Sequence, residues 1–130
     1  MYQHDNRPVR VDGVTKILVT GLVTLDLIFR LQHLPKFGEK YLATDGFLSG
    51  GGNAGNAAVA AARLGGEVSI FAAVGLDDVG ALILKGFQQE GIDTTSVIQL
   101  EDHQSSFSSI VIENSGERQI LNYRKTLGPE

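Results

Sequence analysis

The feature that most constrains the fold is a run of glycines leading into an alanine-rich segment, SGGGNAGNAAVAAARLGG, at residues 49–66. Alanine is the strongest helix former, and glycine supplies the left-handed conformation that ends helices. We therefore expect a helix over residues 53–64 that stops at Gly65 and Gly66. The glycines before it let the backbone approach a ligand, and the unpaired N–H groups of a first helical turn attract polar groups. A ligand site at the start of this helix is predicted.

Short apolar runs flank this helix and alternate with a second helical pattern. Residues 16–21, 67–74 and 96–100 are typical of buried strands, and a helix is predicted to begin at Asp77 and Asp78. Strands that alternate with helices predict a doubly wound α/β sheet. With about three parallel strands and two helices, fewer strands than such sheets usually contain, the fold is expected to be incomplete at its carboxyl end.

The remaining strand patterns form two hairpins that fit neither face of this sheet, so we expect a small separate β subdomain. The four strands of these hairpins are expected at residues 25–34, 40–48, 105–113 and 118–124.

Composition argues against several classes of protein. The net charge is −4 and the basic residues are scattered singly, so we expect no nucleic-acid partner. There is no cysteine and the three histidines are isolated from one another, so we expect no metal site. Residues 1–13 are polar and are expected to be poorly ordered. They contain neither a signal peptide nor a membrane span, which favours a cytoplasmic protein.

Three polar side chains are candidate ligand contacts. Asn53 and Asn56 are three residues apart, so on a first helical turn their amides share a side and suit neighbouring hydroxyl groups. The alternative is that Asn53 only caps the helix and the glycines only turn the chain. Asp26 lies within the apolar run TLDLIF, where sugar hydroxyls would satisfy its carboxylate. Its alternative is an exposed aspartate on an edge strand.

The glycine run also fits a weaker interpretation. Gly50, Gly52 and Gly55 match the GxGxxG pattern of dinucleotide-binding domains, and Asp77 follows some twenty residues later. That pattern requires the glycines directly after the first strand, which here ends near Gly21. A dinucleotide-binding domain is therefore the less favoured alternative.

Five motifs in a fixed order resemble the ribokinase family, also called the PfkB carbohydrate kinases. They are GLVTLD at 21–26, GGNAGNAAVA at 51–60, VGLDDVG at 74–80, GIDT at 91–94 and GERQIL at 116–121. The resemblance runs from about residue 16 to the end of the chain. The glycine loop and the segment RQILNYRKTL at 118–127 look most like ketohexokinases and sulfofructose kinases.

The resemblance implies roles for the candidate residues. The residues that match the family's sugar-binding positions are Asp26, Gly51, Gly52 and Asn56. Asn53 matches a position that is asparagine in ketohexokinases and lysine in ribokinases, which favours a ketohexose or related small sugar as the substrate.

The resemblance also implies a domain organisation. Residues 14–130 would form the amino-terminal part of a ribokinase-like domain, with lid strands at about 27–48 and 105–124. This β lid closes over the sugar and pairs with another subunit in several members, which predicts a homodimer.

One signature of the family does not occur in this sequence. A DTxGAGD segment supplies the family's phosphate-binding anion hole and its catalytic base. The resemblance therefore implies ATP-dependent phosphorylation of a sugar hydroxyl by a full-length protein that uses ATP and Mg²⁺. The present chain would supply sugar binding and the lid, no catalytic residue, and no activity by itself. The alternatives are a non-catalytic sugar-binding or dimerisation module, or an inactive fragment.

Overall fold

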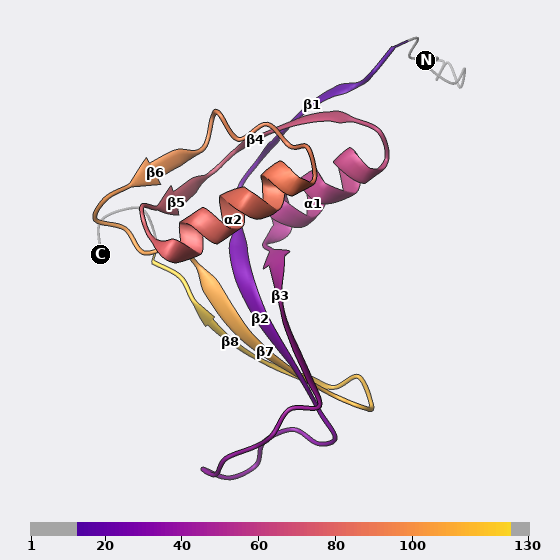
Figure 1. The fold of residues 1–130 in the computed structure, drawn as a ribbon, viewed down its shortest axis with the longest axis vertical. Coiled ribbons are helices and arrows are strands. Elements are labelled where there is room, and N and C mark those ends of the chain that lie inside the picture. Colours follow the sequence, from indigo (N-terminus) through magenta and orange to yellow (C-terminus); the bar gives the residue numbers. More distant parts are fainter. Residues whose placement is uncertain (1–12, 126–130) are drawn as a thin grey trace, which may run out of the picture.

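The computed structural model describes residues 13–125, and the prediction of a poorly ordered start falls, except for Gly13, outside that range (Figure 1). In chain order, the elements are β1 (Lys16–Thr20), β2 (Thr24–Leu31), β3 (Asp45–Gly51), α1 (Asn53–Arg63), β4 (Glu67–Phe71), β5 (Ala73–Gly75), α2 (Asp78–Gln89), β6 (Ile98–Leu100), β7 (Phe107–Glu113) and β8 (Arg118–Tyr123).

The first of two regions, here called the helix layer, contains β1, β4, β5, β6 and both helices. β1 pairs in parallel with β4, and β5 pairs in parallel with β6. The two helices lie side by side over these strands (Figure 1). Small residues permit this close approach, because a Cβ on Gly55 of α1 would already lie 3.5 Å from Cζ of Phe87 on α2.

The hydrophobic core belongs mainly to the helix layer. Ile70 on β4 is 0% exposed, and Ile83 and Phe87 of α2 pack into the same cluster. The loop before β2 and the start of β2 contribute Val23 and Leu25. The core therefore lies between the helices and the parallel strands and reaches the first residues of β2 and, through Phe107, of β7.

The second region, here called the mixed sheet, has the strand order β3-β2-β7-β8. β2 and β7 are parallel neighbours at its centre, and β3 and β8 are antiparallel edge strands. It extends away from the helix layer (Figure 1). The two predicted hairpins thus share one sheet, and the prediction of an α/β fold with a small separate β region is confirmed.

Two strand predictions were wrong in detail. The strand expected over residues 67–74 is interrupted at Ala72, because β4 pairs with β1 while β5 pairs with β6. The strand expected over residues 40–48 begins only at Asp45 and continues to Gly51, since β2 offers partners as far as Thr24. Part of the glycine run is therefore strand and not loop.

Among the described residues, no helix is long and apolar enough to cross a membrane.

Candidate functional site

The carboxylate of Asp26 lies directly against a glycine. Asp26 is a half-buried residue of β2, paired with Ser49 of β3 on one side and Ser108 of β7 on the other. A Cβ on Gly51 would overlap Oδ2 of Asp26, so no other residue at position 51 leaves this carboxylate where it is. The structure therefore brings Asp26 and Gly51 together.

Gly52 turns the chain from β3 into α1. Its φ is 82°, and a Cβ there would collide with the carbonyl group of Leu22, so the backbone requires glycine. Gly52 is also the N-cap of α1 and forms no side-chain capping bond. Asn53 is the first helical residue, so the alternative in which Asn53 merely caps the helix is wrong.

The start of α1 presents two exposed amides and a partial positive charge. Asn53 and Asn56 are both exposed, and the first turn contains no acidic residue to offset the helix dipole. The Ala54 N–H is already bonded to the Leu22 carbonyl at 3.1 Å, which fixes this end of the helix against the loop before β2. The exposed polar side chains of the first turn of α1 are therefore two amides, each able to donate and accept hydrogen bonds.

A groove of about 950 Å³ runs between α1, α2 and β3. Asn56 lines it together with Leu25 and Ser49, whereas Asp26 and Asn53 do not. In the part of the chain that the structure describes, the predicted residues thus meet in two groups. Asp26 contacts Gly51 at the carboxyl end of β3, and Asn56 lines the groove.

Thr24 lies beside Asp26 and Gly51 and has an unusual environment that the sequence does not reveal. It is 6% exposed, it pairs with Gly51, and its Oγ1 is buried without a hydrogen-bond partner among the described residues. A buried hydroxyl without a partner costs about 1–3 kcal/mol. From the sequence, Thr24 is equally consistent with strand packing. Its position two residues before Asp26, on the same face of β2, is the signal that could have identified it.

A polar junction connects the helix layer to the mixed sheet. Asp77, the N-cap of α2, accepts hydrogen bonds from the Gly80 N–H at 2.7 Å, the Ser105 N–H at 2.8 Å and the Ser105 hydroxyl at 2.7 Å. Burial raises the pKa of Asp77, but these bonds and the nearby His103 outweigh that effect and lower the pKa below its ordinary 3.8. Asp77 thus caps α2, and the prediction that a helix begins at Asp77 and Asp78 is confirmed.

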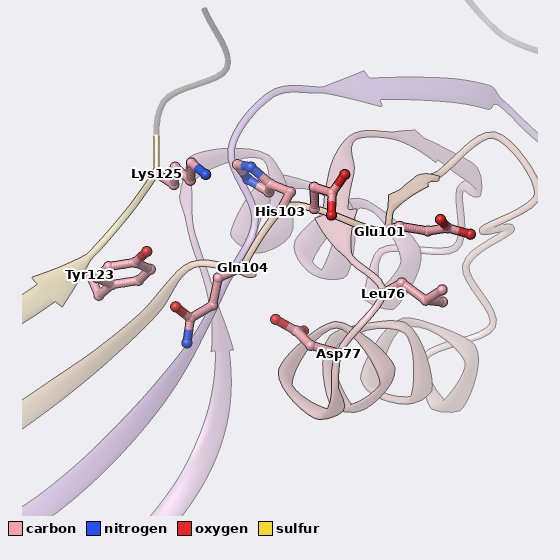
Figure 2. Close-up of a pocket in the computed structure, with 8 residues that line it drawn as sticks. Leu76, Asp77, Glu101, His103, Gln104, Tyr123 and Lys125 are labelled. Carbon is pink, nitrogen blue, oxygen red and sulfur yellow. The ribbon is translucent and has the colours of Figure 1, made fainter. Parts of the chain in front are cut away.

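A hollow of about 390 Å³ lies beside this junction. Figure 2 shows the side chains that line it. Asp77 comes from the start of α2, Glu101 and His103 from the loop before β7, and Tyr123 and Lys125 from the end of β8 and the residues after it. This hollow contains none of the predicted sugar-binding residues. Over residues 13–125, no group of three or more His, Cys, Asp or Glu is placed to hold a metal ion.

Comparison with known proteins identifies the family. The family model for pfkB family carbohydrate kinases matches residues 14–129. Ribokinases from Schizosaccharomyces pombe and Mus musculus are 35% and 31% identical over 111 and 115 residues, which cover 81% and 88% of this chain and 35% and 36% of theirs. A crystal structure from Agrobacterium tumefaciens, provisionally named a ribokinase, is 36% identical with a TM-score of 0.83, and the match covers 86% of this chain and 37% of that one.

A second solved structure, ribokinase from Cryptococcus neoformans in complex with ADP, is 29% identical with a TM-score of 0.69, covering 85% of this chain and 35% of its own. The chain therefore belongs to the pfkB family of carbohydrate kinases. It spans about a third of the length of the curated relatives that it matches. The narrower resemblance to ketohexokinases stays a prediction, because these relatives are ribokinases.

Proposed function

We propose that this chain supplies the sugar-binding part of an ATP-dependent sugar kinase, with the sugar held between Asp26 and the start of α1. One observation carries the proposal. The Asp26 carboxylate lies against Gly51, immediately before the turn at Gly52 and the exposed amides of α1. A carboxylate and two amides at a helix entrance form a set of hydrogen-bonding groups suited to a polyhydroxylated ligand.

Two sugars are the candidates for the substrate. The relatives named above are ribokinases, which makes D-ribose the first candidate. The side chain at position 53 supports D-fructose as the second, because an asparagine at this position resembles ketohexokinases. Asn53 is exposed at the first residue of α1, so it is available to either sugar.

ATP and Mg²⁺ are proposed as the co-substrate and metal of the longer protein. The ribokinase from Cryptococcus neoformans was solved with ADP, which supports a nucleotide for the family member. The residues described here do not fit a metal site, and the sequence contains no DTxGAGD segment. We therefore assign to this chain neither a phosphate contact nor a proton transfer, and limit its proposed role to binding and orienting the sugar.

The proposal is tested by titrating the ¹⁵N-labelled chain with D-ribose and D-fructose and following backbone amide shifts. We expect shifts in β2 and the first turn of α1, and binding about tenfold weaker in Asp26→Asn because a charge-assisted hydrogen bond is lost. Asp45→Asn, which removes an exposed carboxylate from β3, is the matched control and should bind like the wild type. Wild-type chain that binds neither sugar, or undiminished binding by Asp26→Asn, would overturn the proposal.

We also propose that the mixed sheet mediates a homodimer. Leu48 and Leu121 are 54% and 69% exposed on the face opposite Asp26, and the edge strands β3 and β8 are each paired on one side only. Exposed apolar side chains beside open strand edges favour association with a second copy. Sedimentation should therefore show a dimer that Leu121→Lys weakens. A monomer at high protein concentration would contradict this part of the proposal.

A further inference from the structure

One row of the mixed sheet is polar across all four strands. Asp26 pairs with Ser49 of β3 and with Ser108 of β7, and Ser108 pairs with Asn122 of β8. Paired residues of neighbouring strands point to the same face of a sheet, so these four side chains lie together on the face of Asp26. The next row on that face is apolar and consists of Ile28, Phe47, Ile110 and Ile120. The polar row is therefore bordered by an apolar row on the side away from Thr24.

Within this row, the Asn122 amide has a fixed orientation. Its Nδ2 donates to Ser108 Oγ at 3.0 Å and to the Phe107 carbonyl oxygen at 3.4 Å. A carbonyl oxygen only accepts hydrogen bonds, so the nitrogen and not the oxygen of the amide faces β7. The Oδ1 of Asn122 consequently points away from Ser108. Since Asn122 is exposed and no residue of the range 13–125 donates to this oxygen, the oxygen is available to accept a hydrogen bond from a ligand.

Ser108 has a different position in the row. It is 4% exposed, and its hydroxyl oxygen accepts the hydrogen bond that the Asn122 amide nitrogen donates. Ser108 is therefore too buried to be the main ligand contact, but it is placed to hold Asn122.

The spacing of the strands relates Asn122 to Asp26. Neighbouring strands lie about 4.8 Å apart, and β7 alone lies between β2 and β8, so two inter-strand spacings place the backbones of Asp26 and Asn122 roughly 10 Å apart. Both side chains extend from the same face and both present acceptor oxygens. The ligand that matches two separated acceptors is one that carries hydroxyl donors at more than one position, as a sugar does.

We propose that Asn122 is a second sugar contact, accepting a hydrogen bond from a hydroxyl other than the one bound by Asp26. Ser108 is the positioning residue that sets the orientation of the Asn122 amide. This inference rests on the proposed function, because it assumes that the sugar lies on the Asp26 face of the mixed sheet. It extends the site from the entrance of α1 to the edge strand β8.

The first test measures sugar binding by Asn122→Ala in the 130-residue chain, using whichever of D-ribose and D-fructose the wild type binds. Loss of one hydrogen bond should weaken binding about five- to tenfold. The matched control is Gln119→Ala, which removes an exposed amide from the opposite face of β8 and should leave binding unchanged. Melting curves of both variants verify that β8 remains folded.

The second test separates contact from mere sheet stability. If Asn122 binds one hydroxyl, one monodeoxy form of the sugar should bind equally well to the wild type and to Asn122→Ala. If Ser108 acts through Asn122, then Ser108→Ala should weaken binding, while the double variant should be no weaker than Asn122→Ala. Ser109→Ala, from the opposite face of β7, is the control for Ser108.

The outcomes distinguish this inference from the proposed function. Wild-type chain that binds neither sugar overturns the proposed function and this inference together. Binding that depends on Asp26 but is unchanged in Asn122→Ala overturns this inference alone. A loss in Asn122→Ala that persists with every monodeoxy sugar also overturns it, because the effect would then not come from a hydroxyl contact.

Discussion

The helix layer and the mixed sheet of this chain are stabilised in different ways. In the helix layer, helices and strands bury side chains such as Ile70 and Val74 almost completely. In the mixed sheet, only the first residues of β2 and β7 reach that core, and large apolar side chains such as Ile120 and Leu121 stay 50% and 69% exposed. Apolar burial therefore stabilises the helix layer, while ladder hydrogen bonds contribute most to the mixed sheet.

This difference matters for function because the proposed site uses both regions. The helix layer fixes α1, whose start carries Asn53 and Asn56, whereas the mixed sheet carries Asp26. Regions with few buried apolar contacts open at lower free energy than the core does. We therefore expect the half of the site on the mixed sheet to be the half that can adjust around a ligand.

The largest expected effect is the loss of a core side chain from the helix layer. Ile70→Ala should lower the free energy of unfolding by about 2–5 kcal/mol, since it leaves a cavity in a fully buried site. The same truncation at Ile120, which is 50% exposed on β8, should cost less than about 1 kcal/mol. Urea unfolding measures the free energy of unfolding of each variant. Equal decreases for Ile70→Ala and Ile120→Ala would show that the two regions share one core.

The helix layer is also the region that the sequence predicts best. The alanine-rich run and its closing glycines predict α1 to within one residue at its end, because propensity and helix-stop signals agree there. Asp77 and Asp78 likewise mark the start of α2. Both signals are local, so they require no knowledge of what the helices pack against.

The arrangement of the site is less predictable because strand register creates it. Asp26 meets Ser49 and Ser108 only through two different pairings of β2, one antiparallel and one parallel. The same register places the Asp26 carboxylate where a Cβ on residue 51 would otherwise lie. Residues separated by more than 80 positions become neighbours, and no pattern within a single segment contains that information. The sequence therefore identifies the candidate residues better than it predicts which of them touch.

The junction between the two regions is polar and largely buried. Asp77 at the start of α2 holds Ser105, which is 1% exposed and lies just before β7. The Ser105 hydroxyl oxygen in turn accepts the Gly75 N–H at 2.8 Å. The space around this junction is tight, since a Cβ on Gly80 would lie 2.9 Å from Ser105 Oγ. One carboxylate thus connects β5 and α2 of the helix layer to β7 of the mixed sheet.

A smaller effect is therefore expected from Asp77→Ala, which should lower the free energy of unfolding by about 1–2 kcal/mol through loss of the cap and of the bonds to Ser105. Because folding lowers the pKa of Asp77, this stabilisation is fully present above its ordinary pKa of 3.8 and disappears as the pH falls through the lower folded value. Urea unfolding from pH 7 towards pH 3 should show the wild type and the variant converging only at the acid end.

The matched control is Asp78→Ala, which removes an exposed carboxylate from the same helical turn and should lower the free energy of unfolding by only a few tenths of a kcal/mol. If Asp78→Ala lowers the free energy of unfolding as much as Asp77→Ala does, or if the effect of Asp77→Ala does not change with pH, the junction is not what connects the two regions.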